Sequence, residues 1–234
     1  MAAEAVGDRL IELYRSLYEA YGPQGWWPAE TSFEVIVGAI LTQATAWRNA
    51  KRAVENLKSA GGGDLIPHLI LRLDEKKLAE LIRPSGYPNL KARRLKSFVE
   101  HLFKKYSGSL ERMFSQDLDP LRDELLGIHG IGPETADTIL LYAAEKPSFV
   151  VDAYTRRLLR RLGLIEDERI EYEKLRALFM ENLPRDVALY NEYHALIVRH
   201  CKEVCRKRPL CYRCPINALD NVCITLHHKD DGIT

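Results

Sequence analysis

Five cysteines lie close together near the end of the chain and could hold a metal. Their spacing is Cys201-x3-Cys205-x5-Cys211-x2-Cys214-x8-Cys223. In a reducing compartment such a cluster favours a metal site over disulfides. Four thiolates at this spacing can hold zinc or a [4Fe–4S] cluster, and the ligand chemistry alone does not separate the two.

A second candidate site is a glycine turn in the segment Leu125–Ala136, which reads LLGIHGIGPETA. Gly130 and Gly132 let a backbone approach another molecule closely, and Ile131 between them would anchor the turn in the core. Pro133 suits the first position of a following helix. Turn N–H groups followed by a helix N-terminus bind anions, although an ordinary corner between helices has the same pattern.

Asp152 follows the apolar run Ser148–Val151 and precedes a helical segment. A carboxylate at this place is most simply the N-cap of that helix. It could also act on a substrate, and the residue alone does not decide between these roles.

The elements that position these residues are predicted to be helices. Apolar residues recur at helical spacing in ten segments, and strand signals are nearly absent, so we expect an all-α fold. The predicted segments are 4–20, 32–42, 47–60, 74–83, 89–106, 118–127, 133–144, 153–162, 171–182 and 186–204, with Ser32 as an N-cap.

Composition excludes several classes of protein. The formal net charge of +1 argues against binding through a basic tail, but it allows a local basic face on a folded domain. No apolar run is long enough to span a membrane, and the acidic residues near the N-terminus do not suit a signal peptide. We expect an intracellular protein without a membrane partner.

Taken together, the turn and the aspartate resemble the helix-hairpin-helix glycosylase superfamily, which includes endonuclease III. The resemblance extends to Leu41–Thr45, whose Gln43 matches the family residue that enters the duplex, and to Tyr193–Ile197. It implies that Gly130, Ile131 and Gly132 grip a DNA phosphate and that Asp152 is catalytic. It also implies a monomer that acts on double-stranded DNA with a damaged or mismatched base.

The resemblance further implies that the cysteines hold a [4Fe–4S] cluster. The implied ligands are Cys205, Cys211, Cys214 and Cys223, with Cys201 spare. The match departs from endonuclease III, because one residue is missing from the first loop and three are added to the last. A different ligand set, with Cys201 in place of Cys205, or a different metal therefore stays open.

Basic residues near these motifs are candidate phosphate contacts. Arg206, Lys207 and Arg208 form a basic run in the first cysteine loop, and Arg157 follows Asp152. Each has the alternative of an ordinary solvated surface residue, but non-specific DNA binding depends on such charges.

Glu134 occupies the position where endonuclease III has the lysine that forms a Schiff base. A carboxylate cannot form an imine, so this route to lyase chemistry is closed and hydrolysis remains. Glu134 also suits the first turn of a helix for purely structural reasons.

The aromatic residues resemble the 3-methyladenine glycosylase branch of the superfamily. That resemblance implies a base pocket at Trp26, Pro28, Trp47 and Glu134, although tryptophans commonly pack in cores and at least one is expected there. We therefore expect a monofunctional enzyme of base excision repair that removes an alkylated purine. The alternatives are a thymine/uracil mismatch or oxidised-pyrimidine glycosylase, with weak lyase activity, and a non-catalytic DNA-structure binder or a metal-dependent transcription factor.

The implied architecture is a discontinuous pair of helical domains. Residues 29–144 would form a six-helix domain with the hairpin. Residues 1–28 would join 145–234 in a second domain around the cluster loop, and DNA would lie across the cleft between the two.

Overall fold

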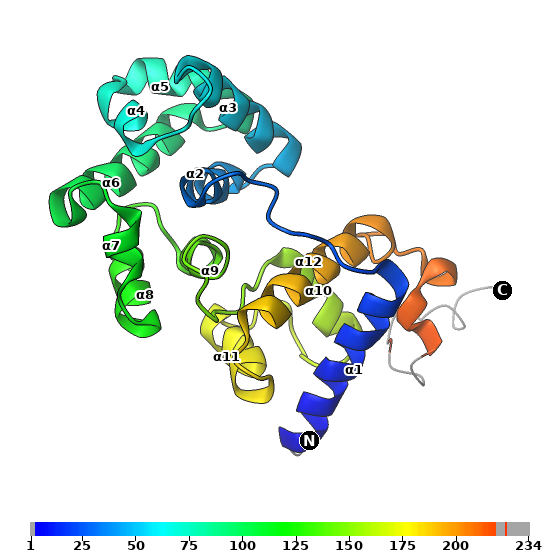
Figure 1. Cartoon of the computed structure of the whole chain (residues 1–234). Helices are drawn as coiled ribbons and strands as arrows, with labels where there is room; N and C mark the ends of the chain where they lie inside the picture. The colour runs from blue at the N-terminus through cyan, green and yellow to red at the C-terminus, as the bar shows by residue number, and fades with distance from the viewer. Residues whose placement is uncertain (1–2, 219–222, 224–234) are drawn as a thin grey trace. The chain divides into compact units, whose positions relative to one another are not determined.

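The computed structural model describes residues 3–218 and Cys223, and every regular element in this part of the chain is helical. The predicted all-α fold is therefore confirmed for the described residues (Figure 1). The chain divides into two compact units. Unit 1 comprises Met1–Trp26 and Pro147–Thr234, and unit 2 comprises Trp27–Lys146.

Unit 2 contains eight α-helices and one short 3-10 helix within the described residues. They are α2 (Ser32–Thr42), α3 (Trp47–Ala60), α4 (Pro67–Arg72), α5 (Glu75–Leu81), η1 (Arg83–Ser85), α6 (Pro88–Tyr106), α7 (Leu110–Phe114), α8 (Leu118–Leu126) and α9 (Pro133–Tyr142). Helix α2 is buried from Phe33 to Leu41 and packs against α3, α6 and α9. An apolar helix surrounded by others forms the core of this unit.

Unit 1 combines the N-terminal helix with the C-terminal part of the chain. Its elements are α1 (Ala3–Tyr21), α10 (Ala153–Arg161), α11 (Tyr172–Asn182), α12 (Val187–Glu203), η2 (Cys211–Arg213) and η3 (Pro215–Ala218). Helix α1 packs on α11 and α12, and the Tyr193 hydroxyl on α12 donates to the backbone oxygen of Leu10 at 2.8 Å. These contacts join segments far apart in the sequence.

Helix starts follow local capping chemistry, with one correction to the predicted caps. The cap of α2 is Thr31, whose hydroxyl accepts from the Glu34 N–H at 3.2 Å, so the predicted cap Ser32 is wrong. Ser32 is instead the first helical residue, because the threonine hydroxyl already satisfies one of the free N–H groups of the first turn. Helices α4 and α7 were not predicted, since five or six residues are too few to reveal helical spacing.

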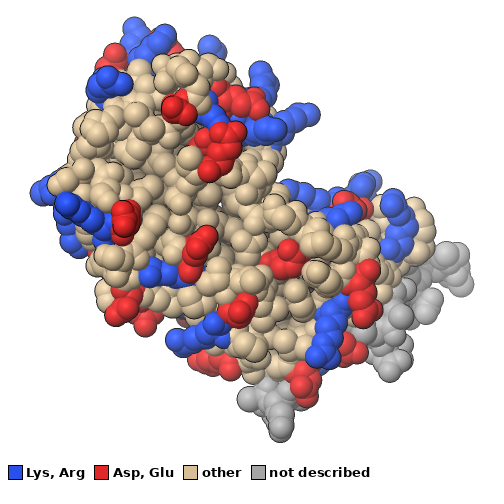
Figure 2. Space-filling view, viewed as in Figure 1, with Lys and Arg blue, Asp and Glu red and all other residues tan. Residues whose placement is uncertain are grey.

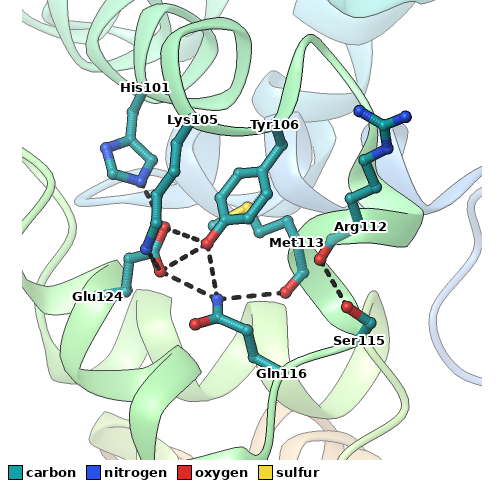
Figure 3. Close-up of polar contacts among 8 residues, drawn as sticks. All are labelled: His101, Lys105, Tyr106, Arg112, Met113, Ser115, Gln116 and Glu124. Carbon is teal, nitrogen blue, oxygen red and sulfur yellow. Dashed lines mark hydrogen bonds and ion pairs between the residues drawn. The ribbon is translucent and has the colours of Figure 1, made fainter.

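A largely buried carboxylate connects α8, which precedes the glycine turn, to α6 and to the loop between α7 and α8. Glu124 on α8 accepts hydrogen bonds from His101 at 2.6 Å and from the Tyr106 hydroxyl at 2.7 and 2.8 Å (Figure 3). Gln116 donates to the same carboxylate at 2.9 Å, and Lys105 forms an ion pair with it. Burial opposes the charge, but these donors outweigh it and lower the pKa of Glu124 to about 2.

Among the described residues, no helix is both long enough and apolar enough to cross a bilayer. Basic and acidic side chains are interspersed on the face that Figure 2 shows, as a net charge of +1 would suggest.

Candidate functional site

The glycine turn between α8 and α9 has two glycines with different structural roles. Gly130 has φ +90°, and a Cβ there would lie 2.2 Å from Cγ of Arg94, so only glycine fits. Gly132 has φ −96°, and a Cβ there would meet nothing within 4 Å. Ile131 is buried, as predicted, and Pro133 occupies the first turn of α9. The turn therefore packs against the Arg94 side chain at Gly130, whereas space is left beside the backbone at Gly132.

Gln43 and Arg94 hold the turn from the inside of unit 2. The Gln43 amide donates to the backbone oxygen of Gly130 at 3.0 Å and to the Thr135 hydroxyl at 2.9 Å. Arg94 donates to the Gln43 side-chain oxygen. Gln43, predicted to enter a duplex, thus also binds the turn that was predicted to grip a phosphate.

Three aromatic residues of unit 2, Trp27, Trp47 and Tyr142, pack against one another. The rings of Trp27 and Trp47 meet edge to face at 5.0 Å, and the Trp27 ring lies 5.4 Å from that of Tyr142. Trp26, Trp27 and Trp47 are all partly exposed, although Trp27 packs against the buried Tyr142.

Pro28 and Trp47, two of the predicted base-pocket residues, line one open groove of unit 2. Acidic side chains share the groove, including Glu30 and Glu34, and Lys58 pairs with both at 2.7 and 2.8 Å. Glu134, the fourth predicted pocket residue, is exposed in the first turn of α9. Trp26 belongs to unit 1.

Asp152 is both the N-cap of α10 and a largely buried acid. Its Oδ1 accepts from the Thr155 N–H at 2.8 Å and from the Thr155 hydroxyl at 3.0 Å. Its Oδ2 lies 3.8 Å from Nε2 of His194 on α12, and the side chain is 15% exposed. One oxygen is therefore fixed by the cap, and the other faces a buried imidazole.

Neighbouring groups favour the ionised form of the Asp152 carboxyl group. Burial by itself would raise the pKa, but the interactions with His194 and Thr155 outweigh it, and the pKa of Asp152 stays below its usual value. A carboxylate that is ionised in a largely water-excluded place can stabilise a nearby positive charge strongly.

Arg157 and Arg161 of α10 bind the first cysteine loop. Arg157, predicted to contact DNA, donates to the backbone oxygens of Cys205 at 3.0 Å and Cys201 at 3.3 Å. Arg161 donates to Sγ of Cys205 at 3.1 Å and to the backbone oxygen of Arg206 at 2.7 Å. The side chains of Arg206, Lys207 and Arg208 are exposed, as phosphate contacts would require.

The predicted metal ligands lie around one cavity of unit 1. Cys205, Cys211, Cys214 and Cys223 all line it, together with His200 and apolar side chains, and Cys201 does not. Within residues 3–218 and Cys223, no three Cys, His, Asp or Glu side chains are close enough to hold a metal ion as they stand. The four thiols therefore line one cavity, but their positions do not form a complete set of metal ligands.

The two buried thiols nearest α10, those of Cys201 and Cys205, differ in how readily they lose a proton. Cys201 is buried beside Cys205, and its Sγ lies 3.6 Å from the backbone oxygen of Tyr154. The hydrogen bond between the two thiols raises the pKa of Cys201 and lowers the pKa of Cys205, which Arg161 lowers further. The thiolate thus forms more readily at Cys205 than at Cys201.

Tyr87 is an exposed aromatic residue outside the predicted site residues. It is 67% exposed and has φ +48°, a left-handed backbone conformation that is unusual for a tyrosine. The buried Lys91 donates to the backbone oxygens of Leu41 and Ser85, which connects this loop to the end of α2 that carries Gln43. The Gly86-Tyr87-Pro88 sequence was the available signal, because Gly and Pro mark a tight turn around an aromatic residue.

Comparison with known proteins agrees with this geometry. Residues 37–185 match the HhH-GPD superfamily of base excision DNA repair proteins. A protein of Methanocaldococcus jannaschii, named as a candidate DNA repair glycosylase, is 52% identical over 212 residues, which are 89% of this chain and 94% of that protein.

Solved structures support the same assignment. A Helicobacter pylori 3-methyladenine DNA glycosylase, MagIII, bound to 1,N6-ethenoadenine, has a TM-score of 0.72 at 31% identity, over 85% of this chain and 97% of that one. Endonuclease III in a non-covalent DNA complex has a TM-score of 0.81 at 19% identity, over 97% of this chain and 99% of that one. The second likeness concerns the fold alone.

The chain belongs to the HhH-GPD superfamily and has the endonuclease III-like glycosylase fold. It is a DNA glycosylase of this superfamily, an enzyme that acts on N-glycosyl bonds.

Proposed function

We propose that this chain is a monofunctional DNA glycosylase that hydrolyses the N-glycosidic bond of a flipped, damaged base, with an alkylated purine as substrate. The observation that carries the proposal is Asp152, which is largely buried, ionised and fixed at one oxygen by Thr155. The identity of 31% with MagIII over 85% of the chain supports the choice of an alkylated purine.

The chemistry follows from the charge of Asp152. Cleavage of the glycosidic bond develops positive charge on the sugar, and a preorganised carboxylate lowers the free energy of that state. Its Oδ2, which is not used by the cap, is the atom that can orient or deprotonate the attacking water. Water then supplies the oxygen that bonds to the sugar, and the base leaves with the bonding electrons.

DNA binding would use one surface on each unit. In unit 2 the open backbone at Gly132 leaves room for a phosphate beside the N-terminus of α9. The exposed ring of Tyr87 can stack on an unpaired base, and Gln43 stays a predicted duplex contact. In unit 1 the exposed side chains of the basic run Arg206–Arg208 can bind phosphates.

The flipped base would be held by aromatic surfaces. Trp26 and Trp47 are partly exposed and Pro28 is exposed, so their faces are available for stacking. A purine nucleotide methylated at ring nitrogen N3 or N7 is cationic, which strengthens stacking on electron-rich rings. Glu134 at the turn provides no amine for an imine, which supports hydrolysis over lyase chemistry.

The four cavity cysteines fit a [4Fe–4S] cluster. Cys205, Cys211, Cys214 and Cys223 line one mainly apolar cavity, and the guanidinium of Arg161 offsets negative charge at Cys205. Four thiolates are the ligand set of such a cluster, which supplies an electron-transfer centre when bound and would join Cys211, Cys214 and Cys223 to Cys205 after the end of α12. Cys201 would remain a buried, uncoordinated thiol.

The decisive experiment replaces Asp152 with asparagine. Asparagine keeps an acceptor for the Thr155 N–H, so α10 stays capped while the negative charge is lost. We expect single-turnover excision of 7-methylguanine and 3-methyladenine from duplex oligonucleotides to fall by at least about 100-fold, with duplex binding retained. The same assay includes hypoxanthine, uracil and thymine opposite guanine, and thymine glycol.

The matched control is Asp186→Asn. Asp186 caps α12 in the same unit, and its carboxylate accepts from the Leu189 N–H at 2.7 Å. This variant makes the same chemical change at a cap and should excise at the wild-type rate. A near-normal rate for Asp152→Asn would overturn the mechanism, and excision of only pyrimidine substrates would overturn the substrate class.

A further inference from the structure

Lys202, near the end of α12, lies at the aromatic surface predicted to hold the base. Its ammonium nitrogen is 5.6 Å from the ring centre of Trp26 and 6.0 Å from that of Tyr154. All three residues belong to unit 1, as does Asp152. The chain thus places a cation on the ring where a flipped base is expected to stack.

Three features make the ammonium group of Lys202 suitable as a proton donor. Burial lowers the pKa of Lys202, and the negative charge of Asp152 opposes that effect only in part. The side chain keeps contact with solvent, so a lost proton can be replaced. The end of α12 is also fixed, because the Arg206 guanidinium donates to the backbone oxygen of Lys202 at 3.1 Å.

Bases differ in how much help they need to leave the sugar. A base alkylated on a ring nitrogen is cationic in the nucleotide and departs as a neutral molecule without further protonation. A neutral base such as hypoxanthine or 1,N6-ethenoadenine would depart as an anion, which is a poor leaving group. Protonation of a ring nitrogen during cleavage removes this difficulty.

We propose that Lys202 is the proton donor to the leaving base, and that it extends excision to neutral damaged purines; this rests on the proposed function. As the bond between the sugar carbon and the base nitrogen breaks, its electron pair stays with the base. The ammonium of Lys202 gives one proton to a ring nitrogen of that base and becomes a neutral amine. Water forms the new bond to the sugar and gives a proton to Asp152, which passes it to solvent, and solvent returns a proton to Lys202.

A simpler role for Lys202 predicts a different result. A cation over an aromatic ring stabilises a fold by packing and electrostatic attraction alone. If Lys202 served only this packing, its loss would change the excision of every substrate by the same factor. If Lys202 donates a proton, its loss should instead slow the excision of neutral bases much more than the excision of cationic bases.

The test compares Lys202→Met and Lys202→Arg on two duplexes that differ only in the lesion. One carries 7-methylguanine, a cationic base, and the other carries 1,N6-ethenoadenine, a neutral one. For Lys202→Met we expect the single-turnover rate on ethenoadenine to fall by about 100-fold or more, with the rate on 7-methylguanine within about 3-fold of wild type. Lys202→Arg should resemble the methionine variant, because arginine keeps the cation over Trp26 but does not release its proton.

The control is Lys174→Met, an exposed lysine on α11 that pairs with Glu171 and should leave both rates unchanged. Equal loss on both lesions, no loss on either, or a wild-type rate in Lys202→Arg on ethenoadenine would each overturn the role of Lys202. Failure of the proposed function is distinct: wild-type protein would then excise neither lesion, and Asp152→Asn would match wild type.

Discussion

At the scale of single residues, Asp152 is the N-cap of α10, and the chemical role proposed for it would use its other carboxylate oxygen. Its Oδ1 caps α10 through Thr155, and its Oδ2 faces His194. The cap holds the side chain in one orientation without consuming both oxygens. A structural role and a chemical role are thus compatible, because a carboxylate has enough lone pairs for both.

The two turn glycines allow a prediction at the same scale. Gly130→Ala should destabilise the protein by several kcal/mol, since the new methyl group would lie 2.2 Å from Arg94 and φ is +90°. Gly132→Ala should change the free energy of unfolding by no more than about 0.5 kcal/mol. It should nevertheless weaken duplex binding, because the added methyl group occupies the open side of the turn.

Chemical denaturation and fluorescence anisotropy with a duplex that contains an abasic analogue measure these two effects separately. Equal duplex affinity of Gly132→Ala and wild type would show that phosphate does not approach there.

At the scale of elements, the sequence predicted long helices well and their tertiary contacts poorly. Helices α2 and α3 begin and end where the apolar spacing placed them. The contact between Gln43 and Gly130, by contrast, joins residues that are far apart in the chain. Helical spacing is a local property, whereas this hydrogen bond depends on how α2 packs against α9.

The Glu124 network predicts a pH dependence of stability. The pKa of Glu124 is about 2 in the folded protein, below the usual value of 4.5. The carboxylate therefore contributes stability above pH 4.5, and this contribution is lost as the pH falls from 4.5 towards 2. Glu124→Gln should lower the free energy of unfolding by about 2 kcal/mol at pH 7, with a smaller difference at pH 3.

Urea denaturation of both proteins at several pH values measures this difference, and Glu111→Gln on α7 is a matched change outside the network. A gap between wild type and Glu124→Gln that stays constant from pH 7 to pH 2.5 would contradict the electrostatic explanation.

At the scale of the whole molecule, unit 1 is assembled from both ends of the chain. Helix α1 packs against α11 and α12, and the cysteine loop is bound to α10 through Arg157 and Arg161. Helix α10 begins after Asp152, and α12 carries His194, Lys202 and the first cysteine. The same two helices therefore support the candidate catalytic acid and the candidate cluster ligands.

This arrangement predicts different results for two neighbouring cysteines. Cys205→Ser should lose the broad absorption at about 400 nm and most of the bound iron and sulfide, because Cys205 lines the cavity. Cys201→Ser should keep both, since Cys201 does not line it. Iron and sulfide analysis of protein purified without oxygen gives the answer, and the reverse pattern would exchange the two cysteines as ligands.

What the sequence determined by itself was local or depended on spacing along the chain. The helices, the turn with its two glycines and the closeness of the cysteines are of this kind, because capping, helical periodicity and ligand spacing act over a few residues. Only the tertiary structure decided that Gln43 binds the turn, that Arg157 binds the cysteine loop and that Lys202 lies over Trp26. Each of these contacts joins segments distant in the chain, and packing between helices, which no local pattern encodes, brings such segments together.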